Sequence, residues 1–181
     1  MSNQIKGYAY AHVSTPTDII VQNNWQGSMS SFKTPTVIKY KDETYTTVDS
    51  WGYPAWVEKP RRKPSSTPSK PIVELFKLHL LGESLEEKDR PFLPDGLDFR
   101  NVIRDYLKKL CESLKESLET TWLNLDFYKK VLIVLTVRDQ NLPMISSLKK
   151  KSFNFFLLSR FRQNLTITRS IHYAIAPLMQ V

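Results

Sequence analysis

The fold is decided by residues 98–122, DFRNVIRDYLKKLCESLKESLETTW, the clearest periodic element of the chain. Apolar residues recur there at steps of three and four, which predicts one buried face of an α-helix about 25 residues long. Asp98 is a suitable N-cap, because its carboxylate can accept hydrogen bonds from the free N–H groups of the first turn. The apolar stripe comprises Phe99, Val102, Ile103, Tyr106, Leu107, Leu110, Cys111, Leu114, Leu118 and Trp122. Cys111 lies in this stripe, so we expect a packed thiol rather than a nucleophile.

Residues 7–57, in the N-terminal half of the chain, have the pattern of β-strands. In residues 7–12, GYAYAH, large and small side chains alternate, which predicts a strand. Residues 37–40 and 44–48 are rich in β-branched and aromatic residues and flank a polar turn, so we expect a β-hairpin. The sequence therefore predicts a β-rich region before the long helix.

Two apolar segments border the helix in sequence. Residues 72–81, IVELFKLHLL, predict a short helix with Phe76 and Leu80 on its buried side. Residues 131–137, VLIVLTV, form a continuous apolar run, which predicts a strand buried on both faces, as in the centre of an α/β sheet. A strand that follows a long helix indicates a crossover connection, so the expected class is α/β.

Basic residues gather in two segments. Residues 58–71 contain four prolines and predict an extended surface loop, either a solvated linker or an anion-binding or nuclear-import patch. Residues 138–181 hold seven Lys or Arg and one acidic residue, whereas residues 1–137 hold 19 and 17. We expect a domain boundary near Val137, followed by a basic tail that is either loosely docked or contacts nucleic acid, an acidic protein or a membrane surface. Within this tail, residues 142–162 suggest a helix and residues 165–168 a strand.

Composition narrows the class of protein. The single cysteine excludes an intramolecular disulfide and favours a reducing compartment, so we expect a cytoplasmic protein, with the nucleus as the alternative. The longest strongly apolar runs are far shorter than the roughly 20 residues that span a bilayer. No Walker-type glycine loop and no paired metal-ligand spacing occurs, and the three histidines are scattered, so no metal site is expected.

Several segments occur in an order typical of one family. They are residues 7–12, 25–27, 33–36, 51–55, 76–80, 93–97 and 132–137. In that order and spacing they resemble the N-terminal part of the ATPase domain of the seventy-kilodalton heat-shock-protein family, which belongs to the actin-like ATPase superfamily. The divergent branch of that family, which contains a long insertion, fits best. The resemblance covers residues 7–137 and implies an incomplete actin-like, ribonuclease-H-like lobe.

The resemblance also implies a ligand and two site residues. It implies ATP with Mg²⁺ as the cofactor. Lys77 matches the family lysine that approaches the transferred phosphate, so it is the candidate catalytic and phosphate-binding residue. Thr36 falls in the Thr-Pro-Ser/Thr turn near the family's cleft and is the second candidate for binding.

The chain departs from the family at the residues that bind phosphate. By alignment, the residues of the first phosphate loop fall at Ser2, Asn3 and Gln4, and residues 138–140 replace the family's continuation after the apolar strand. Phosphoryl transfer depends on positioning by such groups. We therefore expect a truncated, degenerate ATP-binding domain with weak nucleotide binding and no hydrolysis. The alternatives are a basic interaction module acting through residues 58–71 and 138–181, or a gene fragment without function.

Overall fold

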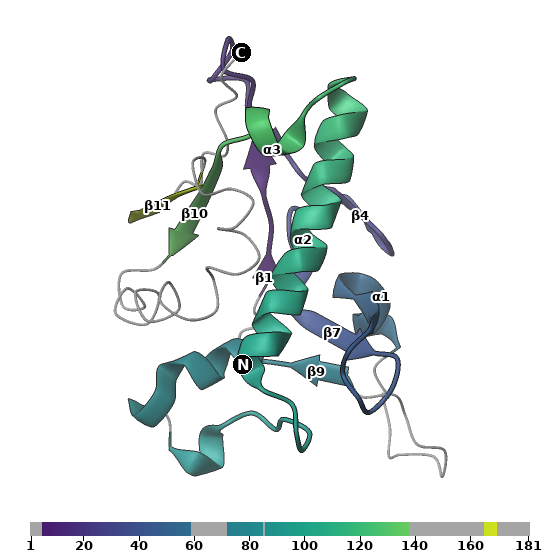
Figure 1. The fold of residues 1–181 in the computed structure, drawn as a ribbon, viewed down its shortest axis with the longest axis vertical. Helices are drawn as coiled ribbons and strands as arrows, with labels where there is room; N and C mark the ends of the chain where they lie inside the picture. Colours follow the sequence, from purple (N-terminus) through teal and green to yellow (C-terminus); the bar gives the residue numbers. More distant parts are fainter. Residues whose placement is uncertain (1–4, 59–71, 85, 138–164, 170–181) are drawn as a thin grey trace. The chain divides into compact units, whose positions relative to one another are not determined.

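The computed structural model describes residues 5–58, 72–84, 86–137 and 165–169, which form a mixed α/β protein with small sheets and one long helix (Figure 1). Within these residues, no helix is both long and apolar enough to cross a membrane. The chain divides into two compact units. The first unit comprises Met1–Gly7 and Asn23–Lys109, and the second comprises Tyr8–Gln22 and Leu110–Val181. The long helix α2 (Phe99–Thr121) runs through both.

A three-stranded antiparallel sheet forms the centre of the first unit. Strand β7 (Val37–Tyr40) lies between β8 (Val48–Trp51) and β9 (Ile72–Glu74), so its backbone is paired along both edges. The register aligns Ile38 with Trp51 on one side and with Val73 on the other. Because β7 is the middle strand, it fixes where the two outer strands lie.

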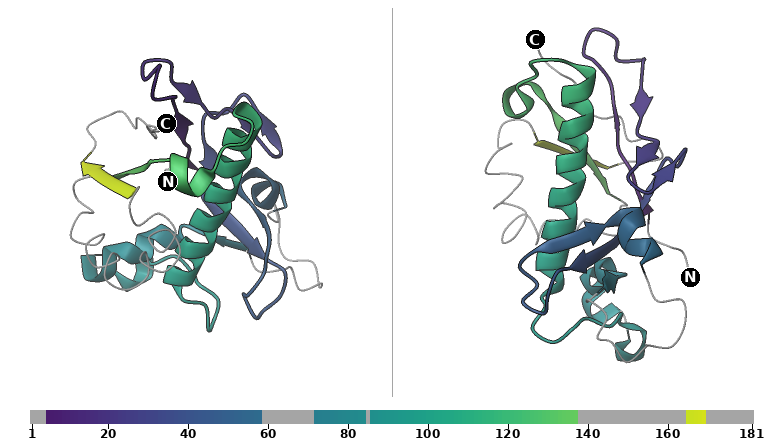
Figure 2. Two further views of the ribbon diagram at one scale, coloured as in Figure 1. Left: turned by 45° about the horizontal axis from the view of Figure 1, so that its top comes forward. Right: turned by 90° about the vertical axis from the view of Figure 1, so that its right-hand side faces the viewer.

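The N-terminal part of α2 packs on this sheet and forms the core of the first unit (Figure 2). Asp98 Oδ1 accepts a hydrogen bond from the N–H of Arg100 at 2.8 Å, which confirms the predicted N-cap. Tyr106 donates from its hydroxyl to the carbonyl of Pro35 at 3.1 Å. The buried residues of this core are Ile38, Tyr40, Val73, Phe76, Leu97, Val102, Ile103 and Tyr106.

Short elements complete the first unit. Strand β1 (Ile5–Lys6) pairs antiparallel with β6 (Thr34–Pro35), and β4 (Asn24–Trp25) pairs with β5 (Ser28–Met29). Helix α1 (Gly52–Val57) starts at a glycine with φ +64°, where a Cβ would collide with the Thr34 hydroxyl. Two 3₁₀ helices, η1 (Phe76–Ser84) and η2 (Glu87–Asp89), precede α2.

The second unit is built on the C-terminal part of α2. Strand β2 (Ala9–Tyr10) pairs antiparallel with β3 (Ile20–Val21), and helix α3 (Phe127–Lys130) follows α2. Tyr8 shares hydrogen bonds with the hydroxyls of Ser113 at 3.2 Å and Ser117 at 2.9 Å. Strands β10 (Ile133–Val137) and β11 (Leu165–Arg169) form a parallel pair.

The structure confirms several predicted elements and corrects others. The long helix and the strand at residues 165–168 are confirmed. Of the hairpin predicted over residues 37–40 and 44–48, the first strand is confirmed as β7. The second is wrong in its bounds, because the strand that pairs with β7 is Val48–Trp51 and Thr44 bonds Asp42 within the turn. The short helix expected over residues 72–81 is wrong in its first part, because Ile72–Glu74 is strand β9 and the helix starts at Phe76. Only Ala9–Tyr10 of the strand expected over residues 7–12 is in a ladder. Residues 59–71 of the loop predicted over 58–71, and the helix at 142–162, lie outside the described residues. The boundary near Val137 stays a prediction.

The Tyr106 hydrogen bond gives the first test of this core. Tyr106→Phe should lower the free energy of unfolding by about 1–3 kcal/mol, because the carbonyl of Pro35 would stay buried without its donor. Tyr53→Phe is the matched control, since the Tyr53 hydroxyl donates at 3.2 Å to the carbonyl of Lys33 in an exposed place, where water can replace the lost donor. Urea denaturation followed by far-ultraviolet circular dichroism would measure both. Equal losses in the two variants would contradict the role given to Tyr106.

Candidate functional site

Lys77 lies in the first turn of η1, directly after the central sheet. Strand β9 ends at Glu74, and the next residue, Leu75, turns the chain into η1 with φ 57°. The N–H of Leu78 closes this turn by donating to the carbonyl of Leu75 at 2.8 Å. A left-handed conformation costs a leucine roughly 1–2 kcal/mol, so the surrounding packing must hold this turn in place. Lys77 is half-buried there.

The fold brings a second lysine to Lys77. Lys6 ends the short strand β1, which is held by pairing with Thr34 of β6. Lys6 lies near enough to Lys77 for its positive charge and its side-chain N–H groups to act on the Lys77 amine. Two positive charges in contact repel each other unless one loses its proton or an anion joins them. Lys6 and Lys77 together are called the lysine pair below.

The surroundings of the lysine pair change its charge. Burial, and after it the nearby charge of Lys6, together lower the pKa of Lys77 to about 7. Near neutral pH, Lys77 therefore exchanges between a charged form and a neutral amine. A ligand with negative charge would favour the charged form, whereas an empty site favours the neutral one.

Thr36 occupies the junction between β6 and β7 and is buried. Its hydroxyl lies beside that of Tyr106, where it partly offsets the rise in the pKa of Tyr106 caused by burial. The Thr36 hydroxyl nevertheless lacks a hydrogen-bond partner of suitable geometry. The described contacts thus place Thr36 against α2 and Lys77 against Lys6, and they do not join the two predicted site residues to each other.

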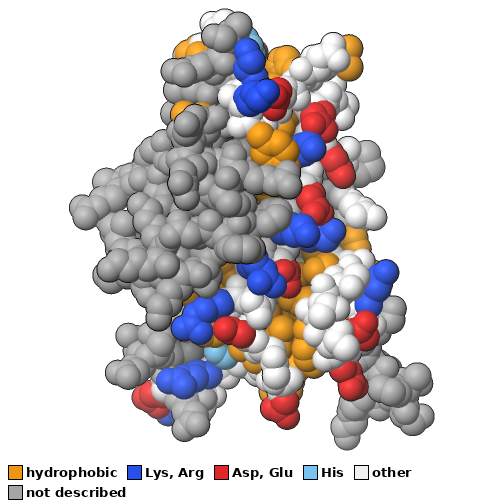
Figure 3. All heavy atoms as spheres, viewed as in Figure 1, with side chains coloured by type: hydrophobic (Ala, Val, Ile, Leu, Met, Phe, Trp, Pro, Cys, Tyr) orange, Lys and Arg blue, Asp and Glu red, His pale blue; other side chains and the backbone are white. Residues whose placement is uncertain are grey.

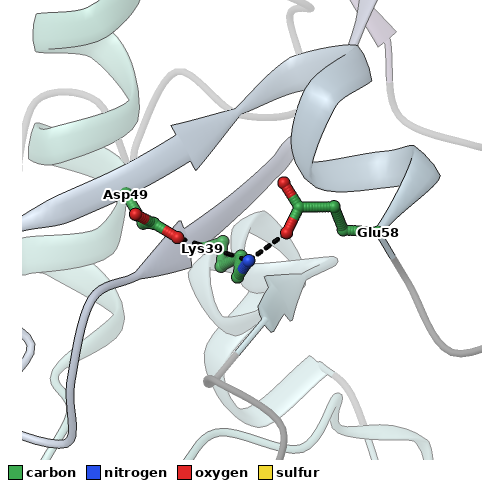
Figure 4. A network of polar contacts seen from close by, with 3 residues as sticks. All are labelled: Lys39, Asp49 and Glu58. Carbon is green, nitrogen blue, oxygen red and sulfur yellow. Dashed lines mark hydrogen bonds and ion pairs between the residues drawn. The ribbon is translucent and has the colours of Figure 1, made fainter.

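In a second charged cluster of the first unit, a lysine is paired with carboxylates. Figure 4 shows Lys39 of β7 between the carboxylates of Asp49, on β8, and Glu58, at the end of α1. The ammonium lies 3.3 Å from Asp49 Oδ2 and also bonds Glu58, and its side chain is only 12% exposed. The hydrogen bond that Lys39 donates to Glu58 is the main reason why the pKa of Lys39 is raised. This cluster ties three elements together and leaves no free charge on Lys39.

Other reactive side chains are arranged for packing. Burial raises the pKa of the Cys111 thiol to about 11, so it stays protonated and poorly nucleophilic at neutral pH, as the sequence predicted. His79 stacks on Phe99 at 5.6 Å between ring centroids, and its Nε2 is buried without a partner. Within the described part of the chain, no group of three or more His, Cys, Asp or Glu side chains is placed to hold a metal ion.

The described surface offers no large patch of one charge on the side drawn in Figure 3, where acidic and basic side chains are interspersed.

No protein-family model, curated protein or solved structure matches the chain. The resemblance to the heat-shock ATPase family therefore stays a prediction from the residues quoted above, as does the cytoplasmic location. Ser2, Asn3 and Gln4, which align with the family's phosphate loop, lie outside the described residues.

Sequence reasoning found one member of the lysine pair and missed the other. Lys77 was selected by its place in the resemblance, whereas Lys6 stands in a short polar segment with no pattern of its own. Its place follows from the pairing of β1 with β6, in which Lys6 lies opposite Thr34, a residue 28 positions later in the sequence. The one signal in the sequence that could have pointed to Lys6 was its position next to the strand predicted at residues 7–12.

Thr36→Val tests whether the Thr36 hydroxyl serves the fold. Valine has nearly the same shape and removes a buried hydroxyl that lacks a partner, so the free energy of unfolding should rise by about 1 kcal/mol. Thr36→Ser is the control, because it keeps the hydroxyl and loses one buried methyl group, which should cost about 0.8 kcal/mol. Chemical denaturation would measure both variants. A clear loss of stability in Thr36→Val would mean that the hydroxyl makes a bond that supports the fold.

Proposed function

We propose that the first unit binds nucleotide phosphates weakly through the lysine pair and does not hydrolyse ATP. The observation that carries the proposal is the closeness of Lys6 and Lys77, two half-buried basic side chains of which Lys6 acts on the charge of Lys77. A phosphate oxygen placed between them would accept charge-assisted hydrogen bonds from both and remove their repulsion. Such bonds are worth more than those between neutral groups.

The charge of the lysine pair is not matched in the way that the charge of Lys39 is. Lys39 bonds two carboxylates, whereas the charged neighbour that acts on Lys77 is another lysine. A cation kept beside a second cation is costly to a fold and is typical of sites built for a ligand. ATP with Mg²⁺ is the ligand that the resemblance implies, and Lys77 is the residue that it assigns to the transferred phosphate.

The absence of hydrolysis in this proposal follows from the sequence. Turnover requires groups that hold the phosphates, the metal and the attacking water together. The residues aligned with the first phosphate loop are Ser2, Asn3 and Gln4, and residues 138–140 depart from the family after the apolar strand. Binding without turnover is therefore the expected remnant of such a domain. Thr36, buried against Tyr106, supports the fold around the lysine pair in this proposal.

The pH dependence of binding tests the proposal. Affinity for ATP or pyrophosphate should fall as pH rises from 6 to 8, because Lys77 loses its proton near pH 7. The ligand itself gains negative charge over that range, so its own ionisation would act in the opposite direction. Isothermal calorimetry with the full chain, in buffers of constant ionic strength, would measure the effect.

Three variants separate the lysine pair from general charge effects. Lys77→Met should weaken binding about tenfold, the loss expected for one charge-assisted hydrogen bond. Lys77→Arg should bind without the fall between pH 6 and 8, because arginine keeps its charge. Lys88→Met, at a side chain that is 75% exposed, is the control and should change nothing. Unchanged affinity in Lys77→Met, or turnover of ATP by the wild type, would overturn the proposal.

The basic tail supports a second candidate function, an interaction module for polyanions. Its support is the charge of residues 138–181, with seven basic residues against one acidic. Lys149→Gln, Lys150→Gln and Lys151→Gln together leave β11 intact and remove three of these charges. For binding to an RNA homopolymer, the plot of the logarithm of the binding constant against the logarithm of salt concentration should become less steep by roughly 2. Absence of binding by the wild-type chain at low salt would end this hypothesis.

A further inference from the structure

We propose that strand β3 is a self-association edge, along which two copies of this chain pair their β3 strands antiparallel and form a reversible dimer. The edge comprises Ile19, Ile20 and Val21, three consecutive branched aliphatic residues of the second unit. The inference rests on the pairing, exposure and charge of this edge, and it does not depend on whether nucleotides bind to the first unit.

Within the described part of the chain, β3 is paired along one side, by β2. The N–H of Gln22 donates to the carbonyl of Tyr8 at 3.1 Å, which shows the side to which Gln22 turns its backbone groups. These groups alternate along an antiparallel strand, so Ile20 and Gln22 direct theirs toward β2. The N–H and C=O groups of Ile19 and Val21 point to the other side, where an added strand could bond them.

The side chains of this edge are exposed as well as its backbone. Ile19, Ile20 and Val21 are 42%, 39% and 43% exposed, although branched aliphatic side chains are usually buried in a folded protein. Because the three residues are consecutive, both faces of the strand present apolar surface. An added strand would therefore remove apolar area from water in addition to forming backbone hydrogen bonds.

The charge around the edge selects the kind of partner. Residues 7–32 contain a single Lys, Arg, Asp or Glu, which is Asp18. Nucleic acids and anionic membranes are bound largely through Lys and Arg, so this edge does not suit them. The complementary partner is an uncharged apolar strand, and β3 of a second copy is such a strand.

The sequence of the edge matches itself in one antiparallel register. With Ile20 opposite Ile20 of the second copy, Ile19 of each copy faces Val21 of the other, which brings together the backbone groups that are open on both strands. Asp18 then lies opposite Gln22, so like charges do not meet. This arrangement has a two-fold axis at Ile20, as is usual in homodimers, where the same patch serves both subunits.

An edge of this length suits a weak dimer. The ladder that holds β3 covers only Ile20–Val21, and the nearby Pro16 and Asp18 oppose a longer pairing. The net charge of +8 also makes two copies repel each other. Salt screens this repulsion, so the dimer should strengthen as salt rises, whereas a contact between opposite charges would weaken.

Sedimentation velocity of the full chain, over about a hundredfold range of concentration, tests the inference. Ile20→Lys and Ile20→Glu should each stay monomeric where the wild type is dimeric, because each places like charges opposite each other at the axis. An equimolar mixture of these two variants should dimerise again, since lysine then faces glutamate. Leu123→Lys and Leu123→Glu are the controls, at a side chain that is 86% exposed, and each should associate as the wild type does.

Several results would overturn the inference. A wild-type chain that stays monomeric at the highest concentration would leave this edge to a strand of another protein. Single Ile20 variants that associate like the wild type, or a mixture that stays monomeric, would also refute it. If the variants fail to fold, amide hydrogen exchange of the wild type decides. Exchange at Ile19 and Val21 should slow as concentration rises, whereas Gln22, already bonded to Tyr8, should not change. Rates at Ile19 and Val21 that do not depend on concentration would contradict the pairing.

Discussion

The burial of strand β7 under the N-terminal part of α2 is the constraint on which the first unit depends. Ile38 and Tyr40 are fully buried there, and Tyr106 of α2 reaches past the strand to bond the carbonyl of Pro35. Because β7 is paired along both edges, it sets the place of β9, and β9 leads through Leu75 to Lys77. The position of the candidate site therefore follows from the packing of one strand and one helix.

The sequence predicted the parts of this fold that local patterns encode. The apolar period of α2 and the cap at Asp98 act within a few residues, and both are present as expected. Strand β9 was missed because Ile72–Glu74 has only three residues and continues into an apolar helical pattern. Its state is decided by pairing with β7, more than thirty positions earlier, and such pairing overrides local preference.

The same distinction explains what could be predicted of the candidate site. Lys77 was found because the resemblance supplied a place for it, and its being half-buried was not visible in the residues around it. Lys6 was missed because its partner is 71 positions away in sequence and is brought near by the pairing of β1 with β6. The resemblance placed Thr36 near the family's cleft, and the structure places its hydroxyl beside Tyr106 in a buried junction.

Two lysines of the first unit show how surroundings, rather than residue type, decide chemistry. The carboxylates around Lys39 favour its charged form, so that ion pair supports the fold. Lys77 has a lowered pKa, so the native state binds fewer protons than the unfolded chain between about pH 7 and the ordinary lysine value. The contribution of Lys77 to the free energy of unfolding therefore rises with pH across that window. Below it Lys77 is charged, and the full cost of placing that charge beside Lys6 lowers the stability of the native state. A fold that carries this penalty near neutral pH gains stability from an anion that binds both charges and removes their repulsion.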